Sequence, residues 1–289
     1  MIVWREIAFL LTNSVEQCAL THATPFGVAL DDMIANGDAP EMIIVFPNTK
    51  TAFLGIGLYD SPTTGDYPTY LSRDLGNHIE ANFRTIPHRD SRGIAGCGDG
   101  TTNVLNLAFT HPDIFSVPVA MTGIYNYENH KIVWQMSTDA FEGMPADFAE
   151  IEAELAQFWP ALALMNLAAG AAPNPDNPPF YLDMPLEMVD GQAQIVPEVA
   201  AKINAADPTH LLQTYLDQPL IFRGMLVYQK TQNELMPVES ARAFDTMLTE
   251  QGVAHEYIEA SGGNVAPWFC DNELAIQFMA EHLSFEMPE

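Results

Sequence analysis

The chain has 289 residues, of which 48% are hydrophobic and 17% are charged, so it can bury a substantial core and is not a disordered protein. Its 38 acidic and 11 basic residues give a formal net charge of −27. A field of that sign repels nucleic acid and anionic lipid, so we expect neither nucleic acid nor a membrane as a partner.

The sequence gives no sign of export, membrane insertion or metal binding. Its first residues lack the basic region and cleavage site of a signal peptide, and no apolar run reaches the ~18 residues of a membrane span. The cysteines Cys18, Cys97 and Cys270 are too widely spaced to predict a disulfide framework or a zinc site. No histidine pair has metal-ligand spacing. We therefore expect a soluble cytoplasmic protein without a cofactor.

Short apolar runs alternate with helical patterns along the first part of the chain. The apolar runs predict buried parallel strands at residues 7–11, 42–46 and 117–121. Helices are predicted at 26–34, ended by Asn36-Gly37-Asp38, and at 71–83, with a long loop at 59–67. A further buried strand, a turn rich in glycine and a helix through 104–108 are predicted from residue 92 onward.

The pattern changes between about residues 129 and 218 and then returns. A mostly apolar helix is predicted at 148–167, followed by a proline-rich loop at 171–179. Strands at 220–222 and 225–228, a helix at 238–248, a strand at 255–259 and a helix at 272–283 complete the pattern. Alternating strands and helices predict an α/β fold with a parallel sheet covered on both faces. We expect one domain, 1–289, with a core of about 1–135 and 217–289 and a helical cap insertion at about 136–216.

The predicted turn between strand and helix has the sequence Gly96-Cys97-Gly98-Asp99-Gly100. A turn of the form small-x-nucleophile-x-small presents the attacking side chain in α/β-hydrolases. Gly96 and Gly100 occupy the small positions. Gly98, at the nucleophile position, has no side chain that could attack a substrate.

Several segments, in this order, resemble the putative-esterase branch of the α/β-hydrolases, which includes S-formylglutathione hydrolases, feruloyl esterases and mycolyltransferases. The resemblance covers roughly residues 7–135 and 217–287, and the matching stretches are 42–47, 83–87, 91–96, 111–116, 233–239 and 255–257 with Gly262-Gly263. It implies an α/β-hydrolase fold, here shortened at the amino terminus because the chain starts at what the family uses as a third strand. It also implies a Ser-His-Asp mechanism with an oxyanion hole.

The resemblance places a residue without the required chemistry at each catalytic position. The nucleophile position is Gly98, the acid position is Asn233 and the histidine position is Asn264, while the oxyanion motif falls on Thr12-Asn13. Loss of one triad member typically lowers the rate by about 10⁴ to 10⁶. We therefore predict no serine-esterase turnover of ordinary size.

Two classes of function follow. The first is a catalytically degenerate esterase homologue kept for binding a small acyl or aromatic ligand, with a pocket including Thr12, Asn13, Asp99 and Trp268, or for binding a protein. A homodimer, or a complex with an active paralogue, would cover the short sheet edge.

The second class is an enzyme with a non-standard nucleophile, Asp99 or Cys97, or a non-hydrolytic enzyme on the same scaffold. A structural role is the alternative for both residues. Asp99 would then stabilise the helix by placing a negative charge at its amino terminus, and Cys97 would be a buried, inert side chain. For Cys270 we expect a structural role.

Overall fold

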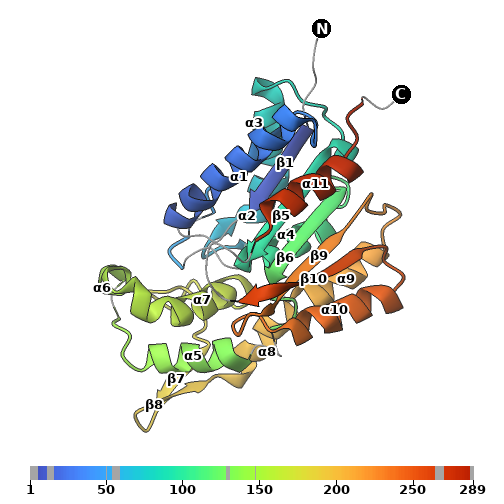
Figure 1. Ribbon diagram of the computed structural model, residues 1–289. Helices are drawn as coiled ribbons and strands as arrows, with labels where there is room; N and C mark the ends of the chain where they lie inside the picture. Colours follow the sequence, from blue (N-terminus) through green and yellow to red (C-terminus); the bar gives the residue numbers. More distant parts are fainter. Residues whose placement is uncertain are drawn as a thin grey trace.

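The computed structural model of this chain describes residues 6–11, 16–49, 51–53, 59–127, 131–146, 148–263 and 270–286. At its centre lies a six-stranded sheet in the order β10-β9-β6-β5-β1-β2, in which every pairing is parallel (Figure 1). This confirms the predicted α/β fold. The strands are β1 (Glu6–Leu11), β2 (Met42–Val45), β5 (Arg92–Gly98), β6 (Val117–Gly123), β9 (Leu226–Gln232) and β10 (Glu256–Gly263).

Helices cover both faces of the sheet, because successive side chains of a strand point to opposite sides. In β5, Ile94 packs with the helices of one face and Ala95 with those of the other. One face carries α4 (Asp99–Thr110), α9 (Pro208–Leu216) and α10 (Val238–Glu250), and the other carries α1 (Glu16–Asn36) and α11 (Asn272–His282), which lie side by side in Figure 1.

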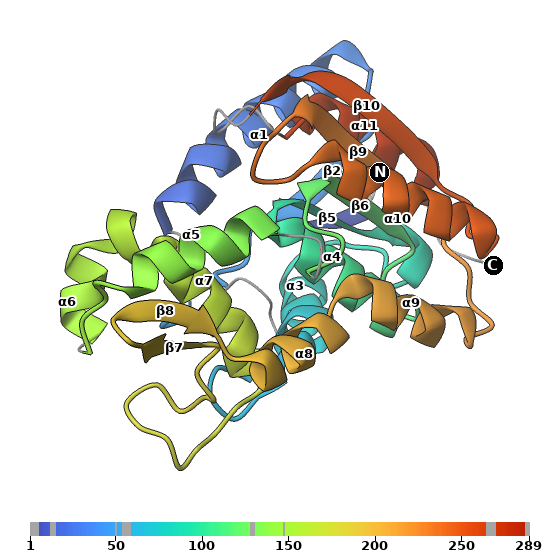
Figure 2. The same cartoon turned by 90° about the horizontal axis from the view of Figure 1, so that it is seen from below.

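The chain between β6 and β9 supplies most of a second hydrophobic cluster, around Phe158, Leu162 and Ile203, to which Phe53 and Met236 also belong. Figure 2 shows most of this segment gathered to one side of the sheet. It contains α5 (Lys131–Phe141), α6 (Phe148–Ala153), α7 (Leu155–Ala171), the antiparallel hairpin of β7 (Leu186–Val189) and β8 (Gln192–Ile195), and α8 (Pro197–Ala205). The assignment of residues 136–216 as a cap remains a prediction.

A smaller group of elements lies between β2 and β5. The predicted loop at 59–67 contains a short antiparallel hairpin of β3 (Asp60–Ser61) and β4 (Gly65–Asp66). The chain then forms α2 (Tyr67–Thr69), the π-helical turn η1 (Tyr70–Asp74) and α3 (Leu75–Asn82), and the 3-10 turn η2 (Arg89–Ser91) leads into β5. The helix predicted at 71–83 is therefore confirmed with a π-helical first turn.

Three predicted elements differ in the structure. Helix α1 begins ten residues before the predicted position and runs through Pro25, and the predicted helix 148–167 is interrupted at Glu154. Residues 220–222 form no strand, because Phe222 packs its ring 4.2 Å from that of Tyr215 and donates its N–H to the Tyr215 hydroxyl. Within the described ranges, no helix is both long enough and apolar enough to cross a membrane.

Candidate functional site

Strand β5 passes into helix α4 without an intervening residue, and the chain changes direction at Gly98. Its backbone has φ 63° and ψ −126°, and it is the residue immediately before the helix. Positive φ is accessible to glycine at little cost but strains residues that carry a Cβ atom. The turn therefore has the sharp form predicted for residues 96–100, with a residue at its apex that has no side chain.

The turn is tight because glycines let α4 approach the ends of β5 and β6. A Cβ atom at Gly96 would lie 2.3 Å from the carbonyl oxygen of Gly100, and one at Gly123 would lie 2.2 Å from Cβ of Thr101. Thr101 in turn donates its hydroxyl to the Met121 carbonyl at 2.8 Å. The first turn of α4 is thus fixed against two neighbouring strands.

Asp99 is the first residue of α4 and is partly buried. The amino terminus of a helix favours a carboxylate. Burial has the larger effect and raises the pKa of Asp99 to about 6. This side chain can therefore gain or lose a proton near neutral pH, which is the property required of a general acid or base.

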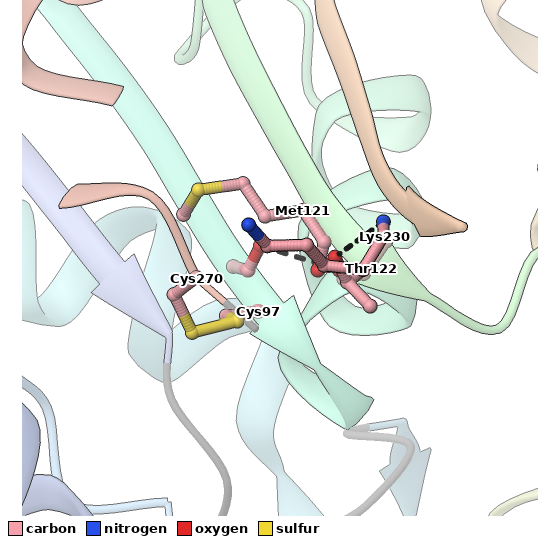
Figure 3. Close-up of a disulfide and its surroundings, with 7 residues drawn as sticks. Cys97, Met121, Thr122, Lys230 and Cys270 are labelled. Atoms are coloured by element: carbon pink, nitrogen blue, oxygen red, sulfur yellow. Dashed lines mark hydrogen bonds between the residues drawn. A yellow bond between two sulfur atoms is a disulfide. The ribbon is translucent and has the colours of Figure 1, made fainter. Parts of the chain in front are cut away.

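Cys97 is joined to Cys270 by a disulfide, which the sequence analysis did not predict (Figure 3). The bond connects the end of β5 to the segment just before α11, with the two Cα atoms 5.8 Å apart. The prediction of Cys97 as a thiolate nucleophile is wrong for this state, because a disulfide sulfur carries no ionisable thiol. Disulfides persist mainly in oxidising compartments, and the expected cytoplasmic location stays a prediction.

Asn233, which the resemblance places at the family's acid position, is buried directly after β9. Its Oδ1 atom accepts hydrogen bonds from the backbone N–H groups of Leu235 at 3.1 Å and Met236 at 3.0 Å. The side chain closes the turn that leads to α10. Because an amide carries no negative charge, Asn233 cannot stabilise an imidazolium as a carboxylate would.

The structure places only some of the predicted site residues. Gly98, Asp99 and the Cys97–Cys270 disulfide lie together at the end of β5, and Asn233 follows β9, which is separated from β5 by β6. Thr12, Asn13, Asn264 and Trp268 lie outside the described residues. In the described part of the chain, no group of three or more His, Cys, Asp or Glu side chains could hold a metal ion.

Sequence reasoning missed a buried polar cluster beside α4. The hydroxyls of Tyr59 and Tyr127 lie 3.2 Å apart, and Tyr59 also donates to the carbonyl of Ala206 at 3.3 Å. Burial raises the pKa of Tyr59 to about 12 and that of Tyr127 well above its usual value. The three residues are spread over almost 150 positions of the sequence, so no local sequence motif could reveal the cluster.

Comparison with solved structures finds the same fold in proteins of low sequence identity. A ferulic acid esterase is 17% identical with a TM-score of 0.62, and the match covers 98% of this chain and 86% of that one. The S-formylglutathione hydrolase FrmB of Staphylococcus aureus is 15% identical with a TM-score of 0.55, covering 97% and 83%. MPT51 (FbpC1) of Mycobacterium tuberculosis is 14% identical with a TM-score of 0.56, covering 98% and 92%.

The likeness to these structures supports the α/β-hydrolase fold predicted from the segment order. The profile of the family described as "Putative esterase" matches residues 19–183, which is more than half of the sequence. With this match, the chain belongs to the putative esterase family.

Proposed function

We propose that this protein is a catalytically degenerate member of the putative esterase family, whose scaffold is kept for binding a small acyl or aromatic ligand or a protein partner. The observation that carries the proposal is Gly98 at the apex of the turn between β5 and α4. Acyl transfer by this family's mechanism requires a side-chain nucleophile at that position.

Two further residues of the candidate site, Cys97 and Asn233, do not replace the serine that the family uses. Cys97 is engaged in the disulfide, and Asn233 is neutral and bonded within its own turn. By resemblance, Asn264 takes the place of the histidine, and an amide cannot accept a proton near neutral pH. Catalysis from binding and the oxyanion hole alone would be worth about 10³ over water, far below a working esterase.

The proposal is tested with oxidised, purified protein in two assays, fluorophosphonate labelling and hydrolysis of p-nitrophenyl acetate. We expect neither to exceed a heat-inactivated control. A variant carrying Gly98→Ser, Asn233→Asp and Asn264→His serves as the matched comparison, since it restores each group that the family uses. Labelling of the parent protein at a serine would refute the assignment.

A second candidate function rests on Asp99, whose raised pKa and position one residue beyond the apex suit acid–base or nucleophilic chemistry. The protein would then be a hydrolase, or a non-hydrolytic enzyme, that uses this carboxyl group. A substrate screen with parent protein and Asp99→Asn separates the two functions. Any turnover that the substitution abolishes would favour the enzyme.

For the partner, we propose a homodimer or a complex with an active paralogue. The support is that β2 and β10 are the outer strands of the described sheet, and exposed sheet edges favour pairing with another chain. Size-exclusion chromatography with light scattering tests the homodimer. A monomeric mass across the micromolar range would count against it, and a pull-down with the paralogue would then test the complex.

A further inference from the structure

A cavity of about 210 Å³ lies beside α4, between the segment around Tyr59 and the start of α9. Pro68, Leu107 and Leu211 give it apolar walls, and the exposed Asp60 marks where it reaches the surface. It is separate from the turn at Gly98, because the residues that α4 contributes lie two helical turns beyond Asp99.

One polar side chain in the lining of this cavity has hydrogen-bonding groups that are not satisfied. Asn106 is only 6% exposed, and neither its Oδ1 nor its Nδ2 atom has a hydrogen-bond partner among the described residues. Buried side-chain polar atoms are nearly always paired, so an amide with both ends unpaired calls for an explanation. A bound molecule with a matching acceptor and donor supplies one.

The neighbouring hydroxyl cannot satisfy both ends of this amide. Asn106 acts on Tyr59 as a hydrogen-bonding neighbour that lowers the tyrosine's pKa against the larger effect of burial, although neither of its polar atoms reaches a partner at full hydrogen-bond geometry. Tyr59 has a single proton, which it donates to the carbonyl of Ala206. At least one polar atom of Asn106 is therefore left for a ligand.

Charge around the cavity selects against anions. The lining residues in the described part of the chain include Asp60 but no lysine, arginine or histidine. Asp207 follows Ala206 directly, its side chain is 1% exposed, and its charge contributes to the raised pKa values of both Tyr59 and Tyr127. A carboxylate ligand would meet this negative field with no lysine, arginine or histidine among the described lining residues to offset it, since His210 contacts Asp207 outside that lining.

We propose that this cavity binds a small, uncharged, planar molecule that presents a hydrogen-bond donor beside an acceptor, with a primary carboxamide on a six-membered ring as the best match. A carboxamide can form two antiparallel hydrogen bonds with the Asn106 amide, while the ring contacts Leu107 and Leu211. A cavity of roughly 150 Å³ accommodates benzene, so this volume suits one ring with one substituent. The inference does not depend on the chemistry at Gly98.

Benzamide is the probe, and binding is measured by isothermal titration calorimetry on the full chain. We expect a Kd on the order of 0.1–1 mM, the range of a ligand this small. Acetophenone has the same shape but lacks the donor, and benzoate carries a charge. Each should bind at least tenfold more weakly than benzamide. Equal binding of benzamide and acetophenone, or no benzamide binding at 10 mM, would overturn the proposal.

Two asparagine variants locate the site. Asn106→Leu removes both polar atoms at similar volume, so it should fold, lose at least tenfold in benzamide affinity and gain affinity for toluene. Asn204→Leu is the matched control, because Asn204 lines a different cavity beside α5 and should leave benzamide binding unchanged. Unchanged binding by Asn106→Leu would place the site elsewhere.

Photolabelling tests the site in the parent protein, so its result does not depend on whether the variants fold. Irradiation of the parent protein with 4-azidobenzamide, followed by peptide mapping, should label residues around Tyr59 or α4, and excess benzamide should suppress the label. Labelling confined to other peptides would contradict the assignment.

Discussion

Replacing Gly98 by alanine should destabilise the folded protein, because the substitution adds a Cβ atom to a residue held at φ 63° and ψ −126°. Side-chain-bearing residues in such rare backbone conformations cost about 1–3 kcal/mol. Unfolding entropy is about 2.1 cal/mol/K per residue, which for 289 residues is about 600 cal/mol/K. The expected fall in Tm is therefore about 2–5 °C.

Thermal unfolding followed by circular dichroism measures this effect, with Gly76→Ala as the control. Gly76 lies in α3 with ordinary backbone angles, and a Cβ atom there would meet nothing within 4 Å. Because alanine favours a helix over glycine, the control should raise the free energy of unfolding by about 0.5–1 kcal/mol. A Gly98→Ala protein as stable as the parent would refute the argument that this position requires glycine.

Three further predictions concern the same end of the sheet. Reduction of the Cys97–Cys270 disulfide, which closes a loop of 173 residues, should lower the free energy of unfolding by up to about 5 kcal/mol in urea titrations, and Cys97→Ser should show the same loss without reductant. Gly123→Ala should lower the same free energy by at least ~2 kcal/mol, because its Cβ atom would overlap Thr101, and a normal Tm would contradict this. Folding raises the pKa of Asp99 from 3.8 to about 6, so the folded state holds this proton more tightly and stability falls as the pH rises through that interval. Asp99→Asn should therefore add about 3 kcal/mol at pH 8 and less than 1 kcal/mol at pH 4, and an equal gain at both pH values would exclude this origin.

The sheet could be predicted because its strands are short apolar runs bounded by turn residues. Met42, Val117 and Glu256 begin strands within one residue of the predicted positions. Helix ends with local signals were also predictable, such as that of α1, where Gly37 has φ 81°. These signals lie in adjacent residues and need no knowledge of the tertiary structure.

The prediction failed where the tertiary structure overrides a local signal. The helical pattern was recognised only from Phe26 onward, whereas α1 begins at Glu16 and extends through Pro25, a residue type that usually interrupts a helix. The apolar run at 220–222 suggested a strand, but Phe222 is used for aromatic packing against Phe109 and Tyr215.

The candidate site was predictable only in part, for the same reason. The glycine pattern around Gly98 is contiguous, so the sharp turn could be inferred from it. The pairing of Cys97 with Cys270 depends on which strand end and which loop the topology brings together, and the Asn106 cavity depends on three separated segments.

The cross-link at the end of β5 also has a consequence for biosynthesis. Cys97 leaves the ribosome 173 residues before its partner, and every strand from β6 to β10 is made in that interval. Throughout this period Cys97 lacks its final partner, so its thiol can react with Cys18 or with another nascent chain. Correct pairing therefore has to wait until these strands have been made, and a disulfide isomerase should raise the yield of the correctly paired protein more than it accelerates formation of the sheet.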